Sequence, residues 1–399
     1  MTSLGRRLRS GIPGALALIV MTAGLARAGE PDRAAVVESY RKAAGFLAGI
    51  QNKNGSWGEV PGSKEKGEIG LTALVLQGLS HAPAAIRKPH EEALGKAATW
   101  IREHQQKSGA ITQDKSGLTT YRTALSMLAL QAHDAKAHKE VIARAQKWLV
   151  DAQFTESDKV SSDNPHYGGW GYGKKGEKPD ADMSNTAFAL QALKASGLSE
   201  DDPAFKRALE FVTRCQNNSE TNKGVGKLRA KDDGGFFYDP GLSRNKSQSS
   251  ENKDGTVSFE SYAGMTYAGL MSLIHAGSSK DDPRVKAALR WIHDHYTLET
   301  NYGLGIRNPK PNADKQGLYY YYLAFAKCCD LLGSPTLETK DGKKNWAKDL
   351  ATKLLAEQKP GGFWINEASE RWWEGNPLVP TAFMVNALPR ILKAMPEKK

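Results

Sequence analysis

The sequence has few cysteines and little strand-like alternation, and each absence excludes a class of protein. Three cysteines in 399 residues, Cys215, Cys328 and Cys329, are too few for a scaffold held by disulfides. Cys328 and Cys329 stand inside an apolar run, which favours core packing over redox chemistry, and a bridge that involves Cys215 stays open. No segment alternates apolar and polar residues over a useful strand length, so we expect an all-α fold.

Long apolar runs are also scarce, and the one that stands out lies at the start of the chain. Three arginines within residues 6–9 precede an apolar stretch over residues 12–25, and Ala26-Arg27-Ala28 has the small-x-small pattern of a cleavage site. This order is typical of a secretory signal peptide, so we expect residues 1–28 to be removed after Ala28 and the protein to be periplasmic or secreted. An uncleaved membrane anchor is the alternative. No later stretch has the length and apolarity of a membrane helix, so none is expected in the mature chain.

The net positive charge of the chain is small once residues 1–28 are left out. Removing its four arginines from the 55 basic residues leaves 51 against 44 acidic ones, a net charge of +7. The basic residues alternate with acidic ones along amphipathic segments, which is typical of a solvated face. A nucleic-acid partner is not predicted, because no basic patch is clustered. The oligomeric state has no signature in the sequence.

A repeat is the strongest feature that is present. An aromatic residue is followed five positions later by Gln in four places, a fifth place keeps the spacing as Trp291/Tyr296, and Gln358 closes a sixth unit. A loop rich in Gly and aromatics follows, and Thr-Ala then opens a second apolar segment. The four aromatic–Gln pairs are Phe46/Gln51, Trp100/Gln105, Trp148/Gln153 and Phe211/Gln216, and the Thr-Ala pairs begin at Thr72, Thr123, Thr186 and Thr381.

The two segments of each unit differ in their apolar pattern. "AFKRALEFVTRCQ" places its apolar residues on one stripe, which predicts a surface helix with one buried face. "TAFALQALKASG" is apolar almost all round, which predicts a helix buried on both sides. Six such pairs predict two concentric shells of six helices over residues 29–399, with repeats from about 35 to 393. An open solenoid is the alternative, but it leaves one face of each inner helix wet.

Two motifs resemble those of a known family. "QNKNGSWG" (residues 51–58) matches the Gln-x-x-x-Gly-x-Trp repeat of squalene–hopene cyclases and related triterpene cyclases, and "QKPGGFW" (residues 358–364) is similar to its variant. With the Thr-Ala helices, the chain resembles the prenyltransferase/squalene-cyclase repeat family, which implies a single α6–α6 toroid. The resemblance further implies that Gln51, Trp57, Gln358 and Trp364 tie neighbouring helices together.

The resemblance also locates a catalytic acid, and this sequence departs from it. Class II cyclases carry Asp-x-Asp-Asp before the Thr-Ala of an inner helix, and the middle Asp protonates the polyene. In the register of Thr186, Asp182 stands at the first Asp, Ser184 at the proton donor and Asn185 at the last position. A serine hydroxyl cannot supply that proton, so we expect the segment to be a helix cap instead. A catalytic Asp182 is the alternative.

A zinc site of the protein-prenyltransferase kind is not expected either. The resemblance would place it on Asp-x-Cys and a later His at inner-helix starts, but the three cysteines lie at helix ends or interiors. Neither residues 261–270 nor residues 381–388 contain a His. Because ligands of a zinc site must converge, we predict no metal and no cofactor.

The loops before the inner helices are the predicted working site. Their residues meet at one end of a closed ring, above helix N-termini that carry a positive dipole. Aromatic rings there suit an apolar or isoprenoid-like ligand with a polar or anionic head. The candidate binding residues are Tyr167, Trp170, Tyr172, Phe237, Tyr262, Trp364 and Trp372.

Two classes of function follow. The first is a cyclase-like toroid that binds an apolar ligand or a partner without the family's catalytic acid or zinc. The second is an enzyme on isoprenoid or carbohydrate substrates that uses acids at the barrel mouth, and a glycosidase would need two carboxylates across a cleft. The loop acids are Asp182, Asp239, Glu260, Glu367, Glu370 and Glu374.

Overall fold

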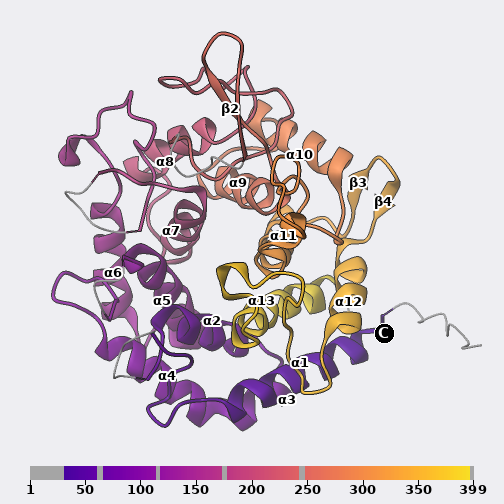
Figure 1. Cartoon of the computed structure of the whole chain (residues 1–399). Helices are drawn as coiled ribbons and strands as arrows, with labels where there is room; N and C mark the ends of the chain where they lie inside the picture. The colour runs from indigo at the N-terminus through magenta and orange to yellow at the C-terminus, as the bar shows by residue number, and fades with distance from the viewer. Residues whose placement is uncertain (1–30, 61–65, 114–116, 173–177, 242–247, 396–399) are drawn as a thin grey trace, which may run out of the picture. The chain divides into compact units, whose positions relative to one another are not determined.

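Six helices form a closed inner ring. The computed structural model describes residues 31–60, 66–113, 117–172, 178–241 and 248–395, and the described chain from Pro31 onward forms one unit. Each inner helix contacts the next, and the last contacts the first, so the ring closes (Figure 1). In order they are α2 (Ile69–Ser80), α5 (Thr119–Asp134), α7 (Met183–Ala195), α9 (Ala263–His275), α11 (Leu318–Leu332) and α13 (Leu378–Ala394).

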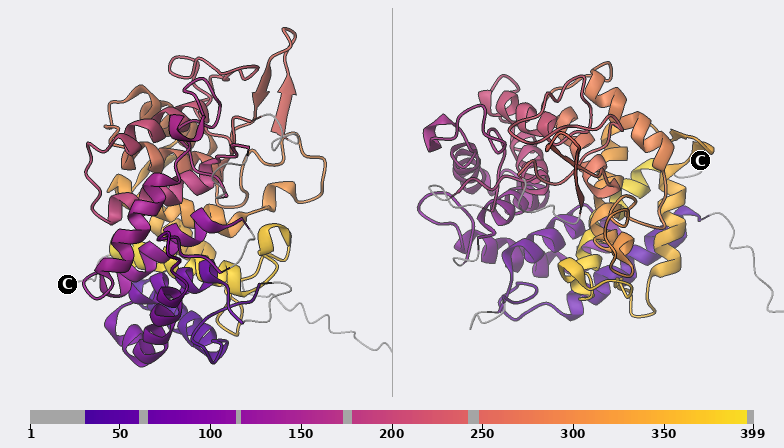
Figure 2. Two further views of the ribbon diagram at one scale, coloured as in Figure 1. Left: turned by 90° about the vertical axis from the view of Figure 1, so that its left-hand side faces the viewer. Right: turned by 45° about the horizontal axis from the view of Figure 1, so that its top comes forward.

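A second set of six helices surrounds the inner ring (Figures 1 and 2). The outer helices α4 and α6 pack between successive inner helices, and α1 packs against α13 and α12. The outer helices are α1 (Arg33–Gly49), α4 (Glu91–Glu103), α6 (Lys139–Asp151), α8 (Pro203–Arg214), α10 (Pro283–His295) and α12 (Trp346–Glu357). The predicted all-α toroid with two concentric shells is therefore confirmed.

The remaining elements are short and lie in the connections. A one-turn helix, α3 (Ala84–Arg87), follows α2, and single 3-10 turns lie at Lys88–His90, Glu156–Asp158, Ala313–Lys315 and Arg371–Trp373. Strands β1 (Ser249–Glu251) and β2 (Val257–Phe259) form one antiparallel hairpin, with Ser250 opposite Ser258. A second hairpin pairs β3 (Leu337–Thr339) with β4 (Gly342–Lys344), with Glu338 opposite Lys343.

Burial follows the two apolar patterns of the sequence. On α7, Leu190 and Leu193 are inaccessible and Phe188 is buried, as expected for a helix covered on both sides. On α8, Lys206 is exposed, whereas Arg207 is half-buried because its Nε donates to Gln153 Oε1 at 2.9 Å. A closed double shell thus explains why only the outer helices carry a polar face.

The repeated glutamines join neighbouring units in the same way. Gln153 Nε2 donates to the carbonyl of Gly168 in its own loop at 2.8 Å and to Ala204 O of the next outer helix at 2.9 Å. Gln51, Gln105, Gln216 and Gln358 make the equivalent two bonds. The fifth unit has Tyr296 at this place, and its hydroxyl donates to Asp349 Oδ2 on α12 at 2.8 Å. Each unit is therefore fixed to the next through buried carbonyls.

The loop tryptophans have a matching role. Trp57 Nε1 donates to Leu47 O at 2.7 Å, and Trp364 Nε1 donates to Leu354 O at 2.9 Å, so each indole ties its loop to the preceding outer helix. The backbone N–H of each tryptophan donates to the Thr of the following inner helix, as in Trp364 N to Thr381 Oγ1 at 3.1 Å. These bonds confirm the tying role that the resemblance implied.

A glycine in five of the six loops permits this close approach, and Gly168 is the example in the third loop. Gly168 has a φ of +80°, and a Cβ there would collide with the carbonyl oxygen of Arg207 on α8. The loop can therefore lie flat against the next outer helix only because this position lacks a side chain.

In the described ranges, no helix combines the length and apolarity that crossing a membrane requires.

Candidate functional site

A cavity of about 420 Å³ opens where the first turns of the inner helices meet. Five of the six inner helices contribute a side chain from near their N-termini: Tyr121, Ser184, Met265, Tyr320 and Phe383. The expected convergence of inner-helix starts at one end of the ring is therefore observed. The volume is in the range of pockets that bury one small organic molecule, roughly 300–1,000 Å³.

Seven aromatic rings dominate the wall of this cavity, which is otherwise lined by amides and a few apolar side chains. Two charged groups, Arg371 and Glu374, complete it. The full lining is Tyr121, Tyr172, Ser184, Tyr238, Gln248, Tyr262, Met265, Asn301, Leu304, Asn308, Gln316, Gly317, Tyr320, Arg371, Trp372, Glu374 and Phe383.

Three of the five phenols in the wall are hydrogen-bonded to one another or to Ser184. Tyr172 OH and Tyr238 OH are 2.7 Å apart, and Ser184 Oγ is 3.0 Å from Tyr320 OH. Burial raises the pKa of Tyr238 and of Tyr320 above the ordinary phenol value, so these two phenols remain protonated. The wall therefore presents ring faces and hydroxyl groups.

Glu374 is the buried carboxyl group of the cavity. Its Oε1 accepts from the backbone N–H of Tyr320 at 2.8 Å, and its Oε2 accepts from Asn366 Nδ2 at 2.7 Å. The side chain thus holds the start of α11, whose free N–H groups need acceptors. Burial raises the pKa of Glu374 to about 7, and the bonds from Asn366 and from the first turn of α11 oppose that rise. Near neutral pH the group is therefore divided between acid and carboxylate.

The rim beside Glu374 is formed by a strained segment. Trp372 and Trp373 have positive φ values of 56° and 64°. In this left-handed region the Cβ atom of a residue comes too close to its own backbone, so residues other than glycine rarely adopt it. Trp372 lies against Gly317, and the Arg371 guanidinium stacks on the Trp372 ring 4.5 Å from its centroid. Arg371 Nη1 also donates to Gln316 Oε1 at 2.7 Å. Backbone strain of this kind is concentrated at functional sites.

Asp182 caps a helix and does not line the cavity. Its Oδ1 accepts from Asn185 N at 2.8 Å, and its Oδ2 accepts from Asn185 Nδ2 at 2.8 Å, which makes it the N-cap of α7. The side chain is fully buried. The predicted cap is confirmed, and Ser184, two residues on, is the side chain that faces the cavity.

Three of the seven predicted binding residues line the cavity: Tyr172, Tyr262 and Trp372. Tyr167, Trp170, Phe237 and Trp364 do not. Trp170 and Trp364 are fully buried because their indole N–H groups tie the loops to outer helices. Phe237 is buried against Phe259, with ring centroids 5.1 Å apart. The structure therefore does not bring these four residues together with the other three at the cavity.

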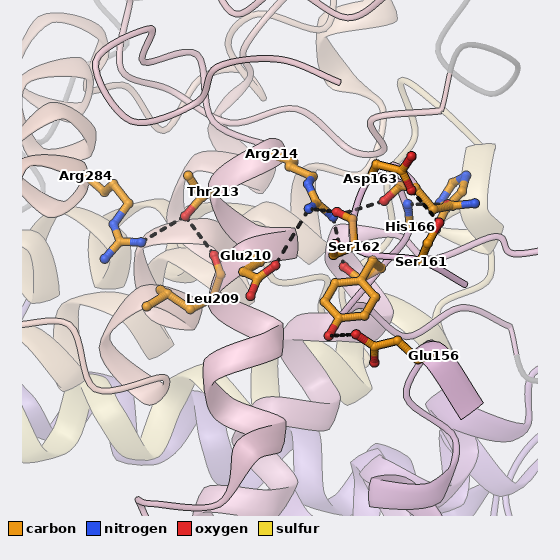
Figure 3. A network of polar contacts seen from close by, with 12 residues as sticks. Glu156, Ser161, Ser162, Asp163, His166, Leu209, Glu210, Thr213, Arg214 and Arg284 are labelled. Atoms are coloured by element: carbon orange, nitrogen blue, oxygen red, sulfur yellow. Dashed lines mark hydrogen bonds and ion pairs between the residues drawn. The ribbon is translucent and has the colours of Figure 1, made fainter. Parts of the chain in front are cut away.

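Tyr167 contacts Glu156 and Arg214, two members of a network of polar contacts (Figure 3). Its hydroxyl donates to Glu156 Oε1 at 2.8 Å, and the Arg214 guanidinium lies over its ring at 5.9 Å. Arg214 also donates to the carbonyls of Ser162 and Asn164. The ring therefore stabilises the loop that precedes α7 instead of facing a ligand.

The other loop acids are engaged away from the cavity. Glu260 pairs with Lys231 at 2.7 Å and with Arg307, and Glu367 pairs with Lys359 at 2.9 Å. Asp239 is buried near His166. Among the described residues, Glu374 is the one carboxyl group that lines the cavity.

Several cavity residues escaped prediction, although their register carries a signal. Tyr121 and Ser184 each stand two residues before the Thr of an inner helix, and Phe383 stands two residues after it. In the tyrosine run of α11, Tyr321 and Tyr322 belong to the core, whereas Tyr320 lines the cavity. Counting two positions back from the repeated Thr would have found Tyr121 and Ser184.

The three cysteines are buried free thiols away from the cavity. Burial raises the pKa of all three thiols, so they remain protonated. In the parts of the chain that the structure describes, no three His, Cys, Asp or Glu side chains are grouped as a metal ion would require.

Comparison with known proteins agrees with this architecture. The squalene-hopene cyclase C-terminal domain matches residues 118–233. A dammaradiene synthase of Dryopteris crassirhizoma is 30% identical over 132 residues, which are 31% of this chain and 19% of that protein. Over these residues the chain is similar to squalene cyclases. The match to the dammaradiene synthase spans about a fifth of the length of that relative. The region that matches the squalene-hopene cyclase C-terminal domain includes the cavity residues Tyr121, Tyr172 and Ser184.

Solved structures are similar in fold over most of the chain. The type II terpene cyclase MstE of Scytonema, without ligand, is 18% identical, with a TM-score of 0.52 over 91% of this chain and 100% of that chain. A possible member of the GH105 family from Salmonella enterica is 12% identical, with a TM-score of 0.53 over 91% and 95% of the two chains. At these identities the likeness concerns the fold alone.

Proposed function

We propose that the cavity of this squalene-cyclase-like protein binds one small molecule with an apolar, isoprenoid-like body and a polar or anionic head. The observation that carries the proposal is the composition of the wall: seven aromatic rings with a single guanidinium and a single carboxyl group. Aromatic walls suit an unsaturated hydrocarbon body, because they offer large apolar area and ring faces. Arg371, at the rim, is placed to receive an anionic head.

A relative with the same fold supports this ligand class. A variant of MstE has been solved with geranylgeranyl dihydroxybenzoate as substrate, a molecule with an isoprenoid chain on an oxygenated ring. For the present chain the body would lie among Tyr121, Tyr262 and Phe383, and the head would meet Arg371 and Gln316. We further propose that binding occurs outside the cytoplasm, since residues 1–28 read as a signal peptide.

A second candidate is acid catalysis on that same ligand, and Glu374 is the observation that favours it. In its acid form Glu374 would give its proton to one alkene carbon, whose π electrons form the new C–H bond and leave a cation on the other carbon. Ring faces in the wall stabilise a cation. Loss of a proton from a neighbouring carbon re-forms an alkene and returns a proton to the carboxylate. A pKa of about 7 suits a group that both gives and accepts a proton.

Glycoside hydrolysis is less well supported. It requires two carboxyl groups about 5–10 Å apart across the cleft. The described cavity offers one, Glu374, and its other charged group is the cation Arg371. The likeness to a GH105-type toroid therefore supports the fold and not that chemistry.

Binding is tested with farnesol and geranylgeraniol, by quenching of intrinsic fluorescence and by thermal shift. We expect saturable binding to the purified protein that is weakened at least tenfold in Tyr262→Ala and in Phe383→Ala. Tyr167→Phe, which lies outside the cavity, is the matched control and keeps wild-type affinity. Equal affinity of all four proteins would reject the cavity as the ligand site.

Catalysis is tested by incubating the same alcohols with the protein and analysing products by mass-spectrometric chromatography. We expect an isomerised or cyclised product that disappears in Glu374→Gln while the dissociation constant changes little. Bound probe without product in the wild type would leave the binding function standing and remove the enzymatic one.

A further inference from the structure

A second concavity lies at the opposite end of the ring, and it is basic where the first is aromatic. It has a volume of about 340 Å³ and is built from the C-terminal turns of inner helices. We call it the basal basin. The side chains that matter are Gln77 and His81 at the end of α2, Gln191 and Lys194 on α7, His275 on α9, and Arg390 on α13.

Two cationic side chains line the basal basin, and the acid near each of them lies outside the lining. Arg390 and Lys194 line it, and no carboxylate does so among the described residues. The nearest acids are shared or exposed. Asp330 lies 4.0 Å from Arg390 Nε but bonds Lys393 at 2.6 Å, and Glu200, which pairs with Lys194, is largely exposed.

A buried lysine lies behind the lining of the basin. Lys327 Nζ donates to Gln191 Oε1 at 2.9 Å. Burial, and then Arg390, lower the pKa of Lys327. Burial, followed by Lys327 and Lys194, lowers the pKa of His275 to about 4. Burial is the larger cause for both groups and the cationic neighbours add to it, so an anion placed between them would relieve only the added repulsion.

Amide groups complete a set of hydrogen-bond donors. Because Lys327 occupies Gln191 Oε1, the Gln191 amide offers the basin its Nε2 as a donor. Gln77 also lines the basin, but its buried Oε1, which has no hydrogen-bond partner among the described residues, is an acceptor that an anion does not satisfy.

We propose that the basal basin is a second binding site, for a small anion that carries a phosphate or pyrophosphate group. A guanidinium, an ammonium and amide donors that approach from several helices match an anion with several acceptor oxygens. The site is independent of the aromatic cavity, because the two share no lining residue.

A purely structural role for these cations makes a different prediction. Helix C-termini carry a negative partial charge, so basic side chains there stabilise the helices without any ligand. In that case the protein would have no saturable anion site at this end, and neutralising one cation would change stability alone. Anion titrations of variants separate the two roles.

The probes are inorganic phosphate and pyrophosphate, titrated into the full chain by calorimetry at constant ionic strength. We expect one pyrophosphate per chain and a higher melting temperature in its presence. Arg390→Gln should weaken binding at least tenfold and Lys194→Gln several-fold. The control is Lys147→Gln, an exposed lysine on α6 that pairs with Asp151, and it should bind as the wild type does.

Two further experiments identify the source of the phosphate and allow for a variant that does not fold. In the first, the protein is mixed with vesicles of phosphatidylglycerol or of phosphatidylcholine. Binding to the phosphatidylglycerol vesicles alone, reversed by pyrophosphate, would identify a lipid headgroup as the ligand. Binding of pyrophosphate without binding to vesicles would identify a free anion. If Arg390→Gln does not fold, Lys194→Gln carries the test. Absence of saturable binding, or equal affinity in Lys194→Gln and Lys147→Gln, overturns the proposal.

Discussion

Ser184 Oγ lies 3.0 Å from the hydroxyl of Tyr320, so the first turns of two inner helices 136 residues apart in sequence meet in the cavity wall. Below them the Phe188 ring packs edge-on against Tyr121, with centroids 5.1 Å apart, and against Tyr320 at 6.4 Å. These rings close the floor of the cavity. A ligand that enters from the loop end therefore stops above α7 and α11 and does not pass through the ring.

Stability should fall as the pH rises through the titration of Glu374. Burial raises its folded pKa to about 7 from an ordinary 4.5, so between these values the folded state binds the proton that the unfolded state releases. The proton on Glu374 therefore contributes fully to the free energy of unfolding below pH 4.5, and this contribution is lost as the pH rises to about 7. The loss amounts to up to about 3 kcal/mol. Urea unfolding of wild type and Glu374→Gln at pH 5 and pH 8 measures it. The wild type should lose stability relative to the variant, and parallel curves would contradict the raised pKa.

Asp182→Ala should destabilise the protein without affecting the aromatic cavity. The substitution removes the acceptor of Asn185 N at a buried N-cap, which costs about 0.5–2 kcal/mol. Asp202→Ala, at the more accessible N-cap of α8, is the comparison and should cost no more. Thermal melts and probe affinity are both measured. A lost affinity at unchanged melting temperature would instead make Asp182 a ligand contact.

Gln153→Ala should be among the costly substitutions outside the inner ring. It leaves the carbonyls of Gly168 and Ala204 without their donor in a buried position, at a cost of about 2–4 kcal/mol. Gln146→Ala removes a half-buried contact to Ser196 and should cost less than about 1 kcal/mol. Chemical denaturation of the two variants gives the comparison, and similar midpoints would argue against the role of the repeated Gln.

Two glycines with nearly equal φ should respond differently to a methyl group. Gly168 and Gly197 have φ values of +80° and +77°, so Ala costs about 1–2 kcal/mol of backbone strain at either. At Gly168 the new Cβ also meets the Arg207 carbonyl, whereas nothing lies within 4 Å at Gly197. Gly168→Ala should therefore lower the melting temperature clearly more than Gly197→Ala does. Equal shifts would show that the loop can lift off α8.

The architecture could be predicted because each unit repeats the same pair of helices, one apolar on a single face and one apolar all round. A helix that is apolar all round must be covered on every side, and six of them with six one-sided helices close into a ring. Gln51 and Gln358 were assigned their tying role from two short motifs, and both donate to a loop carbonyl and to an outer helix.

The residues that line the cavity were harder to predict, because the type of a residue does not determine whether its side chain faces the cavity or the core. Trp170 and Tyr172 are two residues apart in one loop, yet Trp170 donates to Leu149 O in the core and Tyr172 faces the cavity. Glu374 looked like any other loop acid. Its burial depends on the start of α11, 54 residues earlier in the chain, and on the left-handed turn at Trp372 and Trp373. Such pairings become visible only once the ring is closed.

The closed ring also dictates an order of events during folding. Asn386 Nδ2 on α13 donates to Leu74 O on α2 across 312 residues, and Gln358 donates to Ser39 O on α1 across 319 residues. Every other inner helix meets a neighbour soon after it is synthesised, but one flank of α2 must wait for the C-terminal segment. During that interval the apolar flank of α2 that α13 later covers is exposed, which makes the incomplete chain more prone to aggregation than the closed ring.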